Sequence, residues 1–166
     1  MLKDFPRYQP VGILLGATHY AQGNLEQADM YLSSVLVVDP SNLATRKLLA
    51  ATRLRQHKPQ DAVAVLTPAI AHDTNDSEFL ALMGKASLQA GDVGGGILYL
   101  ERGARTDPRN QALQMELAAG YASAGELDRA IDLLESMPET KRGDYRRELL
   151  LILTHLRNDD TDSALT

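Results

Sequence analysis

The sequence contains no cysteine, which excludes disulfide bonds, thiolate zinc sites and cysteine nucleophiles. Tryptophan is also absent, and aromatic residues make up only 5% of the chain, too few for a surface that stacks on sugars or bases. The longest aliphatic run, 149–153, is far shorter than the roughly 20 residues of a membrane-spanning helix. A net charge of −5, with both signs dispersed, argues against nucleic acid, because phosphate binding needs clustered Lys and Arg.

Small and apolar residues recur along the chain at a constant interval of 34 residues. The three clearest series are Ala28, Ala62, Gly96, Ala130 and Ala164; Leu32, Leu66, Leu100 and Leu134; and Leu15, Leu49, Met83, Leu117 and Leu151. A strict interval of this size predicts a solenoid, in which each repeat buries its apolar face only against its neighbours. We therefore predict a repeat protein with a binding function.

Each interval is expected to hold two helices, so the fold class is all-α. In the first interval the helices span Pro10–Gln22 and Leu25–Val38. The second helix ends before Pro40, because the residue that precedes a proline is excluded from the helical region, and Ser41 or Asn42 can cap the next helix. The predicted repeats are 9–42, 43–76, 77–110 and 111–144, with a partial repeat at 145–166.

Several residues modify this scheme locally. Pro59 suits the first turn of a helix, whereas Pro68 falls inside a helix and is expected to kink it. Gly94 and Gly95 are expected to make the helix that contains them the easiest to open, since each helical glycine costs about 0.5 to 1 kcal/mol relative to alanine. Small residues are expected to let the two helices of a repeat approach closely. They are Gly16, Ala50, Gly84 and Ala118 on first helices and Ala28, Ala62, Gly96 and Ala130 on second helices.

The interval also extends to both ends of the chain. Pro6 precedes Pro40 by one interval, and Ala164 stands where a second helix is expected to begin. We therefore expect the 166 residues to be one repeat array taken from a longer protein.

The spacing of particular residues resembles the tetratricopeptide repeat (TPR) over nearly the whole chain. The residues that carry this resemblance are Leu15-Gly16, Tyr20, Gly23, Ala28, Leu32 and Asp39-Pro40 in the first repeat, and Leu117, Tyr121, Gly125, Ala130 and Leu134 in the fourth. Two positions depart from the family pattern. In the four repeats, the usual tryptophan is replaced by Gly12, Arg46, Leu80 and Gln114, and in three repeats the usual aromatic residue is replaced by His19, Arg53 and Ser87. The resemblance implies a right-handed superhelix of antiparallel helix pairs and a noncatalytic protein-interaction scaffold.

Two strings, LLGATHYAQGNLEQA (14–28) and GDVGGGILYLERGARTDP (91–108), also resemble a subfamily. They are similar to repeats of the large bacterial TPR proteins of exosortase and PEP-CTERM sorting systems, which are often lipoproteins linked to exopolysaccharide production. This resemblance implies a periplasmic or membrane-anchored lipoprotein, although this stretch contains no lipobox.

In the TPR family the first helices line a concave groove that binds the partner. The family's ligand-contacting positions correspond here to Ile13, Ala17, Tyr20, Lys47, Ala51, Leu54, Arg55, Lys85, Leu88, Gln89 and Met115, and further to Ala81, Ala119 and Ala122. The alanines leave room, and the basic residues favour an acidic peptide or protein. Ala17, Ala51 and Ala119 stand where the carboxylate clamp of chaperone-binding members needs polar groups, so a cochaperone role is not expected.

No residue pattern indicates catalysis, a cofactor or a metal site. The four histidines form no close pair of zinc-site spacing, and His19 and His155 are expected to pack in the aromatic position of their repeats. The glycine-rich stretch 91–96 lacks the lysine and hydroxyl of a nucleotide loop and is interpreted as a repeat turn.

Two alternatives to peptide binding stay open. Leu149, Leu150, Leu153 and Leu156 would lack a covering helix at the C-terminal end, which favours self-assembly into a homo-oligomer. Direct polysaccharide binding is the second alternative, and the small number of aromatic residues argues against it.

Overall fold

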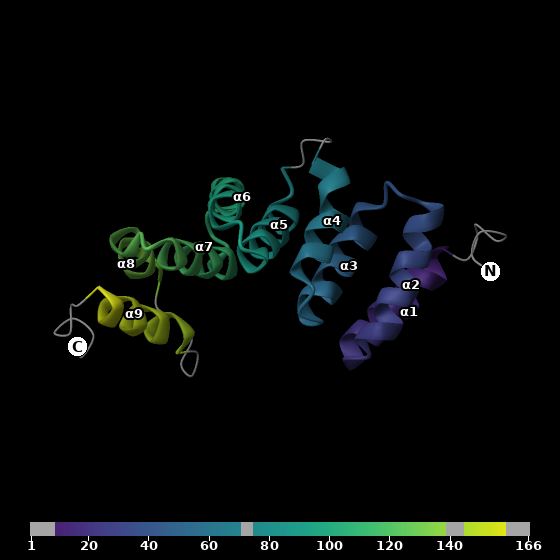
Figure 1. Ribbon diagram of the computed structural model, residues 1–166, viewed down its shortest axis with the longest axis horizontal. Coiled ribbons are helices and arrows are strands. Elements are labelled where there is room, and N and C mark those ends of the chain that lie inside the picture. The colour runs from purple at the N-terminus through teal and green to yellow at the C-terminus, as the bar shows by residue number, and fades with distance from the viewer. Residues whose placement is uncertain (1–8, 71–74, 139–144, 159–166) are drawn as a thin grey trace. The chain divides into compact units, whose positions relative to one another are not determined.

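The computed structural model describes residues 9–70, 75–138 and 145–158, and these ranges contain nine α-helices and no strand (Figure 1). The predicted all-α class is therefore confirmed. The chain divides into two compact units, 1–74 and 75–166. Consecutive helices pack in antiparallel pairs within each unit.

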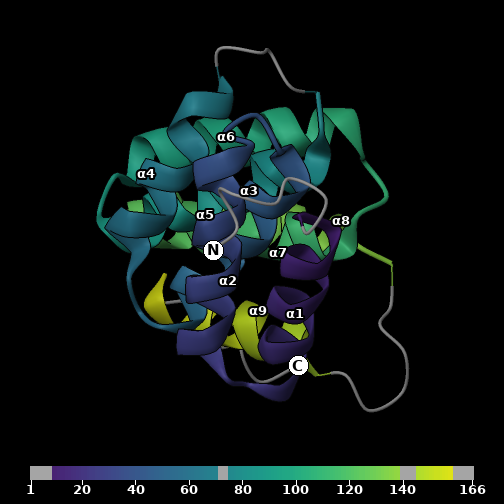
Figure 2. The same cartoon turned by 90° about the vertical axis from the view of Figure 1, so that its right-hand side faces the viewer.

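Unit 1 contains two helix pairs, in which α1 and α2 lie side by side in both views (Figure 1, Figure 2). The helices are α1 (Gln9–Gln22), α2 (Leu25–Val38), α3 (Leu43–Arg55) and α4 (Pro59–Ile70). Both helices expected for the first repeat are thus present, α2 with the expected bounds. α4 begins at Pro59, where a missing N–H costs no helical hydrogen bond, and continues past Pro68 to Ile70.

Unit 2 contains two further pairs and a fifth first helix. They are α5 (Ser77–Ala90), α6 (Val93–Thr106), α7 (Gln111–Ala124), α8 (Leu127–Ser136) and α9 (Arg146–Arg157). α2 and α6 each have 14 residues, whereas α8 has 10 and ends before Met137-Pro138. Helix α8 ends early because Pro138 excludes Met137 from the helical region, and Met137 has φ −73° and ψ 141°.

The turns inside the four described helix pairs share one backbone geometry, which the interval predicts. A residue with positive φ follows each first helix at the same position: Gly23, His57, Gly91 and Gly125. His57 is the non-glycine member of this set, with φ 58°. A left-handed residue here satisfies helix C-terminal carbonyls, and glycine adopts that conformation at the lowest cost.

The links between repeats are also periodic. The side chains of Asn42, Asp76 and Asn110 each accept a hydrogen bond from the backbone N–H three residues later, at 2.9, 3.0 and 3.1 Å. These N-caps satisfy otherwise unpaired donors of α3, α5 and α7, so Asn42 caps α3. Arg46 and Gln114, which replace the family's tryptophan, donate to the carbonyl oxygens of Pro40 and Pro108 and so hold the preceding turn.

The core follows the recurring series. Leu32, Leu66, Leu100 and Leu134 are completely buried, as are the alanines at 28, 62 and 130. Leu15 differs from its periodic equivalents because 37% of its surface is exposed, while Leu49 is 1% exposed. Within the ranges that the structure describes, no helix precedes α1 to cover Leu15 in the way that α2 lies against α3.

Small residues allow α5 and α6 to approach closely where they cross, as predicted for this pair. A Cβ atom added to Gly84 would lie 2.5 Å from Leu100 Cγ and 2.9 Å from the Gly96 carbonyl oxygen. A Cβ added to Gly96 would in turn lie 2.9 Å from the Gly84 carbonyl oxygen. The backbones of α5 and α6 therefore approach so closely that only glycine fits at both positions.

None of the helices in the described part of the chain combines the length and the hydrophobicity that crossing a bilayer requires.

Candidate functional site: the first-helix faces

In unit 1, α1 and α3 contact each other and present the predicted ligand-contacting positions. Ile13, Ala17 and Tyr20 on α1 are half-buried, as are Lys47 and Ala51 on α3. We call these five residues the unit 1 face. Leu54, the remaining predicted apolar position of α3, is 8% exposed and packs in the core, so it offers a partner little surface.

Arg55 joins the two helices of this face. Its guanidinium carbon lies 4.7 Å from the centroid of the Tyr20 ring, and Nη1 donates to the Tyr20 carbonyl oxygen at 2.9 Å. A cation over an aromatic face is attracted by the ring's quadrupole, and the hydrogen bond satisfies a carbonyl at the end of α1. Both predicted site residues therefore also hold α1 and α3 together.

The same contact recurs in unit 2, where Arg157 donates to the Ala122 carbonyl oxygen at 2.7 Å. Arg55 and Arg157 are separated by three intervals of 34 residues, so this shared contact could have been predicted from the periodicity. Sequence reasoning included Arg55 only as a groove cation and missed its part in joining first helices.

In unit 2, the predicted positions on α5 and α7 take three different roles. Lys85 forms an ion pair with Glu116 of α7, which compensates its charge. Leu88 lies against Gly96 and Gly120, so it packs among α5, α6 and α7. Gln89 is exposed.

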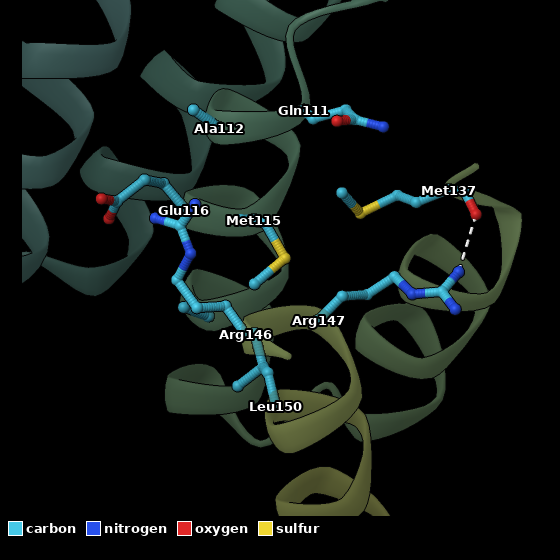
Figure 3. A pocket seen from close by; sticks show the side chains of 9 residues that line it. Gln111, Ala112, Met115, Glu116, Met137, Arg146, Arg147 and Leu150 are labelled. Atoms are coloured by element: carbon cyan, nitrogen blue, oxygen red, sulfur yellow. Dashed lines mark hydrogen bonds between the residues drawn. The ribbon is translucent and has the colours of Figure 1, made fainter. Parts of the chain in front are cut away.

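Met115 lines a pocket of about 470 Å³ between α7, the end of α8 and the start of α9 (Figure 3). The lining residues are Gln111, Ala112, Met115, Glu116, Ala119, Met137, Arg146, Arg147 and Leu150. Sequence reasoning placed Met115 and Ala119 on the binding face but missed the rest, because they come together only when α8 ends early and α9 packs on it.

On α6, α7 and α8 a polar cluster joins three helices. The Tyr121 hydroxyl donates to Glu101 at 2.8 Å, and Arg129 lies 2.9 Å from the same carboxylate and 4.0 Å from the Tyr121 ring centroid. Burial, reinforced by Glu101, raises the pKa of Tyr121 to about 12. The Tyr121 hydrogen bond lowers the pKa of Glu101, and Arg129 adds to this effect. The shifts follow from the burial of a neutral tyrosine and from its hydrogen bond to a carboxylate, and these contacts hold α6, α7 and α8 together.

The position that Tyr121 occupies is filled differently in each repeat. His19 stacks on Tyr31, with 5.5 Å between ring centroids, and Arg53 forms an ion pair with Asp29 at 3.0 Å. Ser87 and His155 are buried. The expectation that His19 and His155 pack in this position agrees with these contacts.

The glycine-rich stretch 91–96 forms a repeat turn. Gly91 ends α5 in the left-handed conformation, and Asp92 caps α6 by accepting from the Gly95 N–H at 2.9 Å. A carboxylate at this helix start would repel a phosphate. Across the residues that the structure places, no three His, Asp or Glu side chains gather as metal ligands would. His72 and the acidic pair 159–160 lie outside these residues.

Comparison with known proteins identifies the repeat. A family model described as tetratricopeptide repeat matches residues 19–86 and 87–151. No curated protein sequence matches the chain.

Solved structures share the fold. The chain is similar to the crystal structure of MamA protein, with 24% identity, a TM-score of 0.82, and coverage of 97% of this chain and 88% of that one. It is also similar to YrrB, described as a TPR protein with an unusual peptide-binding site (15% identity, TM-score 0.74, coverage 93% and 79%). A third similar structure is a thermophilic TPR protein from Thermus thermophilus (20% identity, TM-score 0.74, coverage 95% and 86%).

Proposed function

Since the chain belongs to the tetratricopeptide repeat family, whose members are typically noncatalytic scaffolds for protein interactions, we propose that its first helices bind an acidic peptide or protein segment. The observation that carries this proposal is the exposure of one recurring set of positions. Ile13, Ala17, Lys47, Ala51 and Met115 are half-buried, while most other recurring positions of the same helices are buried. A half-buried surface of small, apolar and basic side chains suits a peptide held by apolar anchors.

The charge on the unit 1 face favours an acidic partner. Lys47 and Arg55 lie on α3, whereas α1 carries neither Asp nor Glu. The peptide-binding site of YrrB adds an analogy from a protein of the same fold. Electrostatic complementarity of this kind mainly raises association rates and selects against basic partners.

Charge reversal at two predicted positions tests the proposal. The double variant Lys47→Glu with Lys85→Glu, immobilised on a resin, is expected to retain no acidic partner that the immobilised parent protein retains. Lys58→Glu with Arg109→Glu is the matched control, because it changes the net charge equally at exposed turn residues. Equal capture by both double variants, each folded by circular dichroism, would eliminate the first-helix faces as the binding surface.

Because Lys85 pairs with Glu116, its reversal also removes a contact between α5 and α7. A second double variant, Ala51→Arg with Ala119→Arg, fills the first-helix faces and keeps that pair. Loss of capture in this variant as well would assign the effect to the faces themselves.

We also propose a setting in bacterial envelope polysaccharide production or PEP-CTERM protein sorting. The support is the resemblance of 14–28 and 91–108 to repeats of that subfamily. The full reading frame and its neighbours test this setting: a lipidation signal beside sorting genes is expected, and a cytosolic operon without them would contradict it.

Self-assembly is a second candidate, favoured by α9. Leu149, Leu153 and Leu156 are 57%, 54% and 47% exposed, and they occupy the positions that correspond to Ile13, Ala17 and Tyr20. Exposed apolar stripes of this kind commonly mark contact surfaces. Light scattering on this chain and on a chain extended by one covering helix tests the idea. A dimer in both chains would support self-assembly. A dimer in the shorter chain alone would show that association comes from the uncovered leucines of α9.

Direct polysaccharide binding has less support, because no aromatic side chain lines the pocket on α7 and Arg55 covers the Tyr20 ring. Specific binding on a glycan array would reverse this ranking.

A further inference from the structure

Arg55 is held in a fixed position beside Tyr20 of the unit 1 face. Its guanidinium carbon lies 4.7 Å from the centroid of the Tyr20 ring, and its Nη1 atom donates to the Tyr20 carbonyl oxygen at 2.9 Å. The side chain of Arg55 is nevertheless exposed. The ring and the carbonyl oxygen therefore orient the guanidinium while leaving it accessible to a ligand.

The remaining donors of Arg55 have no acceptor among residues 9–70, 75–138 and 145–158. A guanidinium carries N–H donors on Nε, Nη1 and Nη2 in a rigid fork, and the structure gives Arg55 one acceptor, the Tyr20 carbonyl oxygen. No carboxylate of these ranges forms an ion pair with it, whereas Arg53 on the same helix pairs with Asp29 at 3.0 Å. The charge and the free edge of Arg55 are thus available to a ligand.

The two helices that hold Arg55 contain no carboxylate of their own. α1, with the sequence QPVGILLGATHYAQ, and α3, with the sequence LATRKLLAATRLR, include neither Asp nor Glu. In unit 2, by contrast, a neighbouring helix supplies the counter-charge: Glu116 pairs with Lys85, and Glu101 pairs with Arg129. A carboxylate that a partner brings to the unit 1 face therefore meets no acidic side chain on α1 or α3 that competes for Arg55.

The ring of Tyr20 is not needed to join first helices. Arg157 makes the equivalent hydrogen bond to the Ala122 carbonyl oxygen at 2.7 Å, although alanine offers no ring. Leu54 and Leu88 stand at the equivalent position of the second and third repeats. The aromatic ring under the guanidinium is thus particular to the first of the four repeats, and it holds the cation in place because a ring face attracts positive charge.

We infer that Arg55, oriented by the Tyr20 ring, determines the specificity of the unit 1 face by binding one carboxylate of the partner through its Nε–Nη2 edge. The inference rests on the proposed function and narrows it to one pair of residues and one ligand group. A planar guanidinium matches a carboxylate with two parallel hydrogen bonds, a stronger pairing than a point charge gives. Orienting the side chain beforehand lowers the entropy that binding costs.

Peptides that differ in one functional group test the carboxylate. The probe is an acetylated, amidated peptide of alanines and leucines with one central glutamate, followed by fluorescence anisotropy, and its counterpart has glutamine there. The whole chain is expected to bind the glutamate peptide at least about tenfold more tightly, equivalent to ~1.4 kcal/mol. A third peptide, with glutamine and a free C-terminus, shows whether a chain end serves in place of a side chain. A preference for neither carboxylate peptide, or no binding at all, would overturn the inference.

Exchanging one cation for another tests Arg55. Arg55→Lys keeps the net charge but replaces the planar fork by a point charge, so the preference over the glutamine peptide is expected to fall below about threefold. Arg157→Lys is the matched control, because it alters the equivalent contact in unit 2, and it is expected to keep the full preference. An arginine that only joins helices would affect both peptides alike. An unchanged preference in Arg55→Lys, or an equal loss in Arg157→Lys, would refute the role of Arg55.

Two substitutions of Tyr20 test the ring. Tyr20→Leu introduces the residue that stands at positions 54 and 88, so the helix pair is expected to fold, but the guanidinium loses its aromatic support. Tyr20→Phe keeps the ring. The preference for the carboxylate peptide is expected to fall in Tyr20→Leu and to be larger in Tyr20→Phe than in Tyr20→Leu. Equal preferences in these two variants would contradict the inference that the ring orients Arg55.

The failure of this inference differs from the failure of the scaffold function. If Arg55→Lys keeps the full preference while Lys47→Glu with Lys85→Glu still prevents partner capture, Arg55 is not the selective residue and the first-helix proposal stands. If Arg55→Lys removes the preference but the face variants leave partner capture unaffected, Arg55 binds carboxylates and the first-helix proposal fails.

Discussion

Replacing glycine by alanine is expected to lower the free energy of unfolding at Gly84, where α5 and α6 cross, and to raise it at Gly94, away from the crossing. In Gly84→Ala, the new Cβ would lie 2.5 Å from Leu100 Cγ and 2.9 Å from the Gly96 carbonyl oxygen. The leucine can rotate, but the carbonyl belongs to a helix backbone, so α5 and α6 must separate. Overpacking of this kind costs about 1 to 3 kcal/mol.

The better helix propensity of alanine offsets about 0.5 to 1 kcal/mol of this cost. We therefore expect Gly84→Ala to lower the free energy of unfolding by up to about 2.5 kcal/mol. Gly94→Ala is the matched variant, because nothing lies within 4 Å of its added Cβ. It is expected to raise the free energy of unfolding by about 0.4 to 1 kcal/mol, since alanine restricts the unfolded chain.

Gly95→Ala completes the series. Its Cβ would lie 2.2 Å from the Asp92 carboxylate that caps α6, so the cap must move away. Loss of an N-cap costs about 1 kcal/mol, which cancels the gain from alanine. Stability is therefore expected to stay near that of the parent protein.

The assay combines urea denaturation, followed by circular dichroism, with amide hydrogen exchange in α5 and α6. Exchange is needed because a repeat array opens locally. Faster exchange is expected in Gly84→Ala and slower exchange in Gly94→Ala. Equal stabilisation by both substitutions would refute the argument that backbone contact, and not glycine propensity, governs this crossing.

Three further outcomes are expected. The pKa of Tyr121 is raised from its ordinary value of 10 to about 12, so its neutral form adds to the free energy of unfolding fully below pH 10, and this addition is lost as pH rises toward 12. The free energy of unfolding of the parent is therefore expected to fall between pH 10 and pH 12 by more than that of Tyr121→Phe. Ala62→Leu is expected to lower stability by about 1 to 3 kcal/mol, since Ala62 is completely buried, and an unchanged melt would contradict the packing. His57→Gly is expected to raise the melting temperature by relieving a left-handed conformation that costs about 1 kcal/mol, and Gly91→Ala to lower it for the converse reason; opposite signs would show that these turns are unstrained.

The sequence by itself determined the repeat and its helices. A strict interval, glycine at turn positions and Asp, Asn or Pro at the links act locally, so the helix pairs and α2 in full could be predicted before any contact was known. The buried series from Leu32 to Leu134 could be predicted for the same reason, because each repeat buries the same residue at the same position.

Only the tertiary structure decided which of the predicted site residues also hold the helices together. Lys85 and Arg55 were expected to offer charge, yet Lys85 pairs with Glu116 and Arg55 covers Tyr20. Such contacts join helices about one interval apart in the chain, and no local propensity records them. The pocket under Arg146 has the same origin: a proline ends α8 early, and three helices then bring together side chains that the sequence keeps apart.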